Sequence, residues 1–234
     1  MIIPCLEGQL LVDRFALITG GSSGIGYAIA ESFLKNGAKV IICGRNKEKL
    51  IEAKNSLMKD CKCTCDKIDV LLLDISNVKE MDIILSKYLD DKRIDIFVNN
   101  AGVNAGDLFP NTAEQEYDKV LNTNLKGMYF ISQIIVKYMI DKKIRGNVLN
   151  ITSSSALRPG ISPYIISKWG ENSLTLGMAK KYLPYGIIVN GLAPGSTLTP
   201  MLKNNSDDDL YLDYSPAKKI CSTRRNRKYS NSTC

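Results

Sequence analysis

A tyrosine and a lysine with a spacing suited to acid–base chemistry lie in the second half of the chain. Tyr164 and Lys168 are four residues apart in a segment of helical character, so their side chains share one helix face. A free phenol has a pKa of about 10, too high for a base at neutral pH. An ammonium about 4 Å away, at an effective dielectric constant of roughly 20, stabilises the phenolate by about 4 kcal/mol, or about three pKa units. The pair therefore predicts a tyrosine that gives a proton to a substrate oxygen, or takes it back.

A glycine-rich turn early in the chain has the composition of a phosphate-binding site. The run from Thr19, TGGSSGIG, follows an apolar strand-like segment and opens a helix-like one. Glycines let the backbone approach a pyrophosphate, and a helix N-terminus offers N–H groups and the positive end of a dipole. The residues expected to contact a dinucleotide here are Gly20, Ser22, Ser23, Gly24, Ile25 and Gly26.

The elements that would position these residues alternate along the chain. Unbroken apolar runs at 15–19, 39–43, 70–73, 95–98, 148–151 and 187–190 predict buried strands. Helical signals cover 25–36, 46–59, 81–88, 112–139 and 163–182, with Asn77 and Thr112 as N-caps of the third and fourth helices. This alternation predicts an α/β Rossmann fold, a doubly wound parallel sheet of six strands with helices on both faces. We expect a single domain over residues 1–217.

The glycine spacing departs from the common Gly-x-Gly-x-x-Gly fingerprint and resembles the Thr-Gly-x-x-x-Gly-x-Gly of short-chain dehydrogenases/reductases. The resemblance continues in the family's order along residues 10–202. It extends to the 3-oxoacyl-acyl-carrier-protein reductases and their broad-specificity relatives, and it implies hydride transfer between a nicotinamide and a carbonyl or secondary alcohol carbon. The matching residues after the turn are Asp74, Asn99 to Gly102, Asn124, Ser153, Tyr164, Lys168 and Pro194 to Thr199.

The resemblance also implies a role for each matching residue. Ser153 would orient the substrate oxygen, Lys168 would bind the nicotinamide ribose as well, and Asn124 would hold a water linking Lys168 to solvent. Ser153 precedes the tyrosine by eleven residues, fewer than the family commonly shows, so Ser154 or Ser155 could take its role. The implied cofactor contacts beyond the glycine turn are Asp74, Ile75, Asn100, Ala101, Gly102, Tyr164, Lys168, Pro194, Gly195, Thr197 and Thr199.

The end of the second strand indicates which nicotinamide cofactor is preferred. NAD enzymes usually place an acid there, which accepts hydrogen bonds from the ribose 2′-hydroxyl and repels a 2′-phosphate. This chain has Gly44 and then Arg45, whose guanidinium can pair bidentately with a phosphate, although a lone arginine can also be a solvated loop charge. The sequence therefore predicts NADP(H) as the preferred cofactor and leaves NAD(H) open.

Composition excludes several other chemistries. The chain has no histidine, which rules out Ser-His-Asp hydrolysis and histidine-ligated metals. Cys61, Cys63 and Cys65 are too closely spaced for a usual zinc site, so we interpret them as exposed loop cysteines and expect no metal. Seven cysteines, no signal peptide and no apolar run of membrane-spanning length predict reduced thiols, a cytoplasmic location and no membrane partner.

Most of the net charge of +7 lies in the last residues, and removing them leaves a body close to neutral, so no nucleic-acid partner is expected. Where the resembled family continues with a Pro-Glu-Glu-Ile-Ala helix and a seventh strand, residues 223–234 are basic and polar. One back-translation of these residues, read one base later, encodes Pro-Glu-Glu-Ile-Ala-Asn-Ile-Ala-Thr-Val-Leu. We therefore expect residues 218–234 to be an out-of-frame tail after a frameshift near residue 222, or else a natural disordered tail. The charges in question are Lys218, Lys219, Arg224, Arg225, Arg227 and Lys228.

Two other functions stay open beside the reductase. Loss of the seventh strand would favour a dinucleotide-binding protein with impaired turnover, and the basic tail alone would favour a polyanion-binding protein. For the enzyme, the expected partners are a small carbonyl or alcohol substrate and a second copy of the chain. The helices from Thr112 and Pro163 would pair across a two-fold axis, whereas a tetramer is not expected without the last strand.

Overall fold

A computed structural model describes residues 9–90, 92–104, 109–201 and 221–222. Within these ranges six parallel strands form one sheet in the order β3-β2-β1-β4-β5-β6. Each predicted strand is present, with its ends shifted by at most two residues, and the doubly wound Rossmann prediction is confirmed. The strands are β1 (Phe15–Thr19), β2 (Lys39–Gly44), β3 (Ile68–Leu72), β4 (Ile96–Asn99), β5 (Asn147–Ile151) and β6 (Ile188–Leu192).

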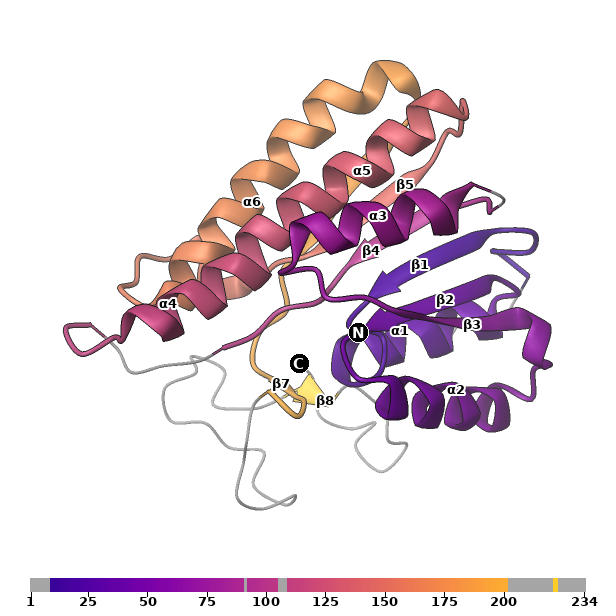
Figure 1. Ribbon diagram of the computed structural model, residues 1–234, viewed down its shortest axis with the longest axis horizontal. Helices are drawn as coiled ribbons and strands as arrows, with labels where there is room; N and C mark the ends of the chain where they lie inside the picture. Colours follow the sequence, from indigo (N-terminus) through magenta and orange to yellow (C-terminus); the bar gives the residue numbers. More distant parts are fainter. Residues whose placement is uncertain (1–8, 91, 105–108, 202–220, 223–234) are drawn as a thin grey trace.

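Helices cover both faces of the sheet (Figure 1). On one face pack α1 (Gly24–Lys35) and α2 (Lys47–Cys61); on the other lie α3 (Val78–Leu89), α5 (Met128–Asp141) and α6 (Pro163–Tyr182). Successive strand residues point to opposite faces, so Leu17 joins the core under α3 and α5 while Ala16 and Ile18 join the core under α1 and α2. This two-sided burial explains why the strands are apolar without interruption.

The strand order reverses next to β1, and this reversal places the site. The chain winds outward from β1 to β3, crosses back to β4 beside β1, and continues to β6 in the other direction. Open α/β sheets of this kind have a crevice at the carboxyl ends of the strands, at the point of reversal. The glycine turn follows β1, and the loop after β4 faces it across this crevice.

The long helix predicted from Thr112 to residue 139 consists of three segments. It begins with α4 (Glu114–Val120), continues as a π-helical segment, η2 (Leu121–Gly127), and ends with α5. The N-cap is Ala113, so the predicted cap at Thr112 is wrong by one residue. A cap at Asn77 is confirmed, because its side chain accepts a hydrogen bond from the Glu80 N–H of α3.

Short elements complete the described chain. They are the 3-10 turns η1 (Cys65–Lys67), η3 (Ser154–Leu157) and η4 (Leu183–Tyr185), and the two-residue strands β7 (Thr197–Leu198) and β8 (Cys221–Ser222). β7 and β8 pair in parallel. The remainder of the predicted tail, 218–220 and 223–234, lies outside the described residues, as does the stretch 202–217.

The closely spaced cysteines are only in part the exposed loop residues that the sequence suggests. Cys61 ends α2 and Cys63 follows it, and both are half-buried against the α1–α2 core, whereas Cys65 is exposed. A free thiol can pack as a small apolar group, which explains why Cys61 and Cys63 are buried more than the sequence suggests. Burial raises the pKa of the Cys61 thiol to about 11. Within the described ranges, no group of three potential ligands is arranged to hold a metal ion, and no helix is long and apolar enough to cross a bilayer.

Candidate active site

A cavity of about 350 Å³ lies at the carboxyl ends of the strands, between the glycine turn, the loop after β4 and the start of α6. Most of the site residues predicted from the sequence line it together. They are Gly20, Ser22, Ser23, Gly24, Ile25, Arg45, Asp74, Ile75, Asn100, Ala101, Gly102, Tyr164, Lys168 and Thr199.

The glycine turn is shaped for close approach of a ligand backbone. Gly20 and Gly24 have φ angles of +63° and +58°, a region that side chains disfavour. A Cβ atom on Gly26 would lie 2.4 Å from the carbonyl oxygen of Gly20, so this residue sits beneath the turn rather than in the cavity wall. The α1 N-terminus has Ser23 as a cap without a side-chain hydrogen bond and no acid in its first turn. These features fit the pyrophosphate of a dinucleotide.

A brace joins the turn to the loop after β4. The hydroxyl oxygen of Thr19 accepts hydrogen bonds from the main-chain N–H groups of Asn100 (2.8 Å) and Ala101 (2.9 Å). The Asn100 side chain in turn donates to the carbonyl oxygens of Thr19 (2.9 Å) and Gly20 (3.2 Å). The two loops that form the cavity floor are therefore fixed relative to each other.

Two cations stand at the far end of the cavity, near the end of β2. Arg45 lines the wall, and so does Lys49, which was not among the residues expected from the sequence. Asn46 caps α2 by accepting a hydrogen bond from the Lys49 N–H at 2.8 Å, so Lys49 lies in the first turn of α2 and lines the same cavity as Arg45. Lys49 could have been predicted from the sequence, because it lies four residues after Arg45 at the start of a helix. This end of the cavity is suited to an added phosphate.

Tyr164 and Lys168 lie one turn apart near the start of α6, and both line the cavity. Ser162 caps this helix by accepting a hydrogen bond from the Ile165 N–H at 3.2 Å, and Pro163 fits its first position. The Lys168 nitrogen lies 5.6 Å from the centre of the Tyr164 ring. The structure thus brings together the two residues on which the predicted acid–base chemistry depends.

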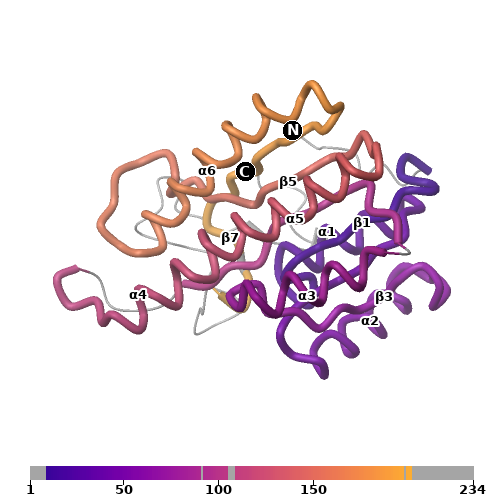
Figure 2. Tube along the Cα trace, turned by 45° about the horizontal axis from the view of Figure 1, so that its top comes forward, coloured from indigo at the N-terminus to yellow at the C-terminus, as the bar shows by residue number. Residues whose placement is uncertain are grey.

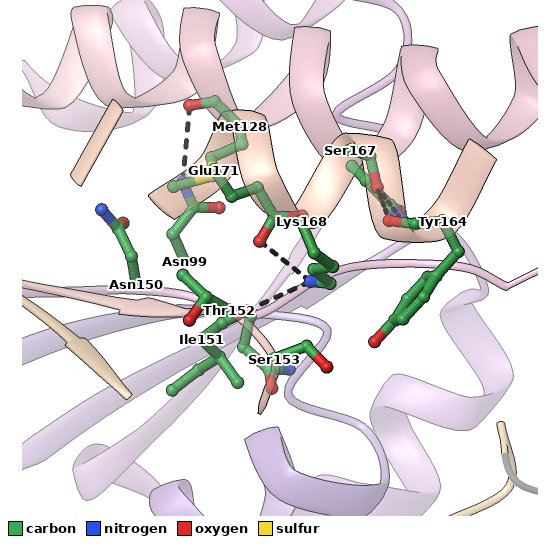
Figure 3. Close-up of polar contacts among 12 residues, drawn as sticks. Asn99, Met128, Asn150, Ile151, Thr152, Ser153, Tyr164, Ser167, Lys168 and Glu171 are labelled. Carbon is green, nitrogen blue, oxygen red and sulfur yellow. Dashed lines mark hydrogen bonds and ion pairs between the residues drawn. The ribbon is translucent and has the colours of Figure 1, made fainter. Parts of the chain in front are cut away.

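A buried carboxylate holds the lysine, and the sequence analysis missed it. The Lys168 ammonium donates to Glu171 Oε2 at 2.9 Å and to the Ile151 carbonyl oxygen at 3.2 Å. Figure 3 shows the ammonium between this carboxylate and the Tyr164 phenol. Burial raises the pKa of Glu171 to about 7, and the neighbouring lysine acts in the opposite direction. A spacing of three residues on one helix could have indicated the pair.

Asn124 is fully buried in the π-helical segment and does not line the described cavity. Its side chain accepts from the Val103 N–H (2.8 Å) and donates to the Val103 carbonyl (2.9 Å) and to the Ser167 hydroxyl (3.1 Å). It therefore ties the loop after β4 to α6. π-helical segments occur frequently at functional sites, and this one directs the Asn124 side chain inward, between the loop after β4 and α6.

Ser153 follows β5 and is the N-cap of η3, where its hydroxyl accepts a hydrogen bond from the Ser155 N–H at 3.1 Å. It is buried, and Figure 3 draws it on the Tyr164 side of the Lys168 ammonium rather than on the Glu171 side. The Ser154 N–H donates to the Pro194 carbonyl at 2.9 Å, which joins this turn to the segment after β6. As far as the cavity is described, Ser153 and three residues of that segment are not part of its lining, namely Pro194, Gly195 and Thr197.

Comparison with known proteins places the chain in a family. Residues 14–210 match the family model described as short chain dehydrogenase. The chain belongs to this family. It is therefore an oxidoreductase of a fold that binds nicotinamide dinucleotides, as the glycine turn and its cavity indicate.

Named relatives support this membership. The chain is 36% identical over 194 residues to a 3-oxoacyl-acyl-carrier-protein reductase of Thermotoga maritima, covering 82% of this chain and 77% of the relative. It is 32% identical over 202 residues to a gluconate 5-dehydrogenase of Gluconobacter oxydans, covering 85% and 77%. Among solved structures, actinorhodin polyketide ketoreductase with NADPH superposes with a TM-score of 0.73 at 29% identity, covering 80% of this chain and 72% of that one.

Proposed function

We propose that this short-chain dehydrogenase is an NADPH-preferring reductase that interconverts a small carbonyl compound and its secondary alcohol. The observation that carries the proposal is that Tyr164 and Lys168 share one cavity with the glycine turn. Bound NADPH would supply the hydride, and NADP⁺ would accept it in reverse. The chain's own residues supply binding, orientation and the proton.

Tyr164 is the proposed proton donor to the substrate oxygen during reduction. The Lys168 ammonium lies beside the phenol ring and favours the phenolate that remains after transfer. Ser153 is proposed to orient the substrate oxygen. The buried Asn124 is proposed to hold α6 against the loop that follows β4, and to bind a water that relays protons. Tyr164 and Ser153 can fill these roles only if they lie within hydrogen-bond distance of the substrate oxygen.

Preference for NADPH is proposed from the two cations, Arg45 and Lys49, at the far end of the cavity. Either side chain can pair with a 2′-phosphate, and the carboxylate of the described lining, Asp74, follows β3 and accepts hydrogen bonds from the N–H and the hydroxyl of Ser76. The similar ketoreductase was solved with NADPH, which agrees with this preference. The 3-oxoacyl reductase and gluconate dehydrogenase among its relatives favour a polar carbonyl or hydroxy substrate.

A homodimer is proposed from the outer face of α5 and α6, which run side by side in both views (Figures 1 and 2). Four large apolar side chains on this face are between 45% and 66% exposed. A second copy would cover them, and sedimentation of the purified chain would show one species of twice the chain mass. The side chains concerned are Tyr129, Ile166, Trp169 and Leu176.

The proposed function is tested by two measurements on the full chain. Calorimetric titration with NADPH and NADH measures binding, and loss of NADPH absorbance measures turnover with β-ketoesters, quinones and ketoses. Tight NADPH binding with turnover of at least one carbonyl class supports the proposal. NADPH binding without turnover of any carbonyl compound would support the dinucleotide-binding alternative. If neither cofactor binds, both the reductase and the dinucleotide-binding hypotheses are contradicted.

A further inference from the structure

The pair formed by Lys168 and Glu171 is unusual because both charges are almost completely buried. The two side chains are 6% and 3% exposed, and the second carboxylate oxygen, Oε1 of Glu171, has no hydrogen-bond partner among the described residues. Burying a charge is costly unless another interaction offsets the cost. An ion pair at this depth, next to the proposed proton donor, needs a functional explanation.

We infer that Glu171 is a positioning residue, which anchors the Lys168 ammonium on the strand side of the cavity and partly cancels its charge at the Tyr164 phenol. The inference rests on the proposed function, in which Tyr164 is the proton donor. It adds a third ionisable group to the two that the sequence predicts.

The geometry supports both parts of this inference. The two acceptors of the ammonium, Glu171 Oε2 and the Ile151 carbonyl, hold it from the side opposite the phenol. Along α6, Lys168 is four residues from Tyr164 and Glu171 is seven, so the carboxylate is farther from the phenol than the lysine is. Charge interactions weaken with distance, so the negative charge offsets only part of the lysine's effect on Tyr164.

Other charges do not compete for this role within the described chain. The described neighbours of α6 are η2, η3, α4, α5, η4 and β6, with β5 contributing the carbonyl. The charged residues of α5, Lys137 and Asp141, are exposed. The segments η2, η3, β5 and β6 contain one charged residue, the exposed Lys126 of η2. The charged residues of α4 are exposed or half-buried, and η4 adds only the exposed Tyr185. Lys168 is the charged group that lowers the pKa of Glu171, against the larger effect of burial.

The sign of the effect follows from electrostatics. A negative charge disfavours a phenolate, so an ionised Glu171 raises the pH at which Tyr164 loses its proton. Removal of the carboxylate is expected to lower that pH by roughly one unit, which corresponds to about a tenfold larger phenolate fraction below the midpoint. The carboxylate is expected to affect Tyr164 in this way above about pH 7, where Glu171 itself is ionised.

The test is a tyrosinate titration by ultraviolet difference absorbance, which needs neither cofactor nor substrate. Subtracting the curve of Tyr164→Phe isolates the signal of Tyr164 in the unchanged chain, and the same subtraction is made in Glu171→Gln and Glu171→Ser. Both uncharged variants are expected to show Tyr164 ionising about one pH unit lower. Serine leaves room for water around the ammonium, so it serves if the glutamine variant does not fold.

Glu171→Asp is the matched control, because it keeps the negative charge and is expected to leave the Tyr164 midpoint close to that of the unchanged chain. An unchanged or higher midpoint in the uncharged variants would overturn the inference, as would an equal shift in the aspartate variant. Absence of NADPH turnover with the titration shift intact would instead refute the proposed function and leave the charge coupling standing.

Discussion

The hydroxyl oxygen of Thr19 lies 2.8 Å from the main-chain nitrogen of Asn100, across the point where the strand order reverses. One fully buried side chain at the end of β1 thus fixes the loop after β4. The same oxygen accepts from the Ala101 N–H at 2.9 Å. Cavity geometry and fold stability are therefore linked at this residue.

Replacing this acceptor is expected to destabilise the chain. Thr19→Val keeps the shape of the side chain but leaves the N–H groups of Asn100 and Ala101 without their acceptor. We expect the free energy of unfolding to fall by roughly 2–4 kcal/mol, measured by urea denaturation. Thr19→Ser retains the oxygen and should lose much less. Equal losses in the two variants would show that the hydroxyl is not the stabilising group.

Gly26 gives a test of the close packing beneath the turn. A Cβ atom there would lie 2.4 Å from the carbonyl oxygen of Gly20, so Gly26→Ala must displace backbone that lines the cavity. We expect at least about tenfold weaker NADPH binding by calorimetry. Gly177→Ala is the control, because nothing lies within 4 Å of its Cβ position. It should bind NADPH normally and be more stable by about 0.5–1 kcal/mol.

Cofactor preference should follow the charge at residue 45. Arg45→Glu places a carboxylate where an added phosphate would bind, so the ratio of NADPH to NADH affinity should fall by about tenfold or more. Lys47→Glu changes the charge equally at an exposed position outside the described cavity lining and should leave the ratio unchanged. Equal changes in the two variants would indicate general charge attraction instead of a contact.

Glu171 should also make stability depend on pH. Its pKa is about 7 in the folded chain, against an ordinary value of 4.5, because burial disfavours the charged form. The folded state therefore holds this proton more tightly, so the contribution is complete below about pH 4.5 and is lost as the pH rises through about 7. Between these limits the unchanged chain should lose roughly 1–3 kcal/mol relative to Glu171→Gln. Urea denaturation of both at several pH values measures this difference, and a constant difference would contradict it.

The sequence predicts much of the fold because its strands are buried on both faces. Runs such as 39–43 are apolar almost without interruption, and Asn77 marks a helix start with a residue that is preferred there. The π-helical segment from Leu121 to Gly127 was not predictable, since its change of hydrogen-bond pattern leaves no signature in composition. The half-burial of Cys61 and Cys63 likewise depends on how α2 packs against α1.

In the candidate site, too, some residues were predictable from the sequence and others depend on tertiary packing. Tyr164, Lys168 and the glycine turn were predictable from their spacing, and the structure gathers them in one cavity. Lys49 and Glu171 were missed because each looks like an ordinary charge on an amphipathic helix until tertiary packing shows which face it occupies. Whether Ser153 reaches the substrate depends on the turn after β5, which spacing alone does not define.

Tyr164 is proposed to supply the proton in a nicotinamide-dependent carbonyl reduction. The most direct test of this role compares NADPH binding and NADPH oxidation in the unchanged chain and in Tyr164→Phe, with the carbonyl compound that is reduced fastest. The variant is expected to bind NADPH within a few fold of the original affinity and to lose turnover by about a hundredfold or more. Turnover retained within a few fold would contradict it.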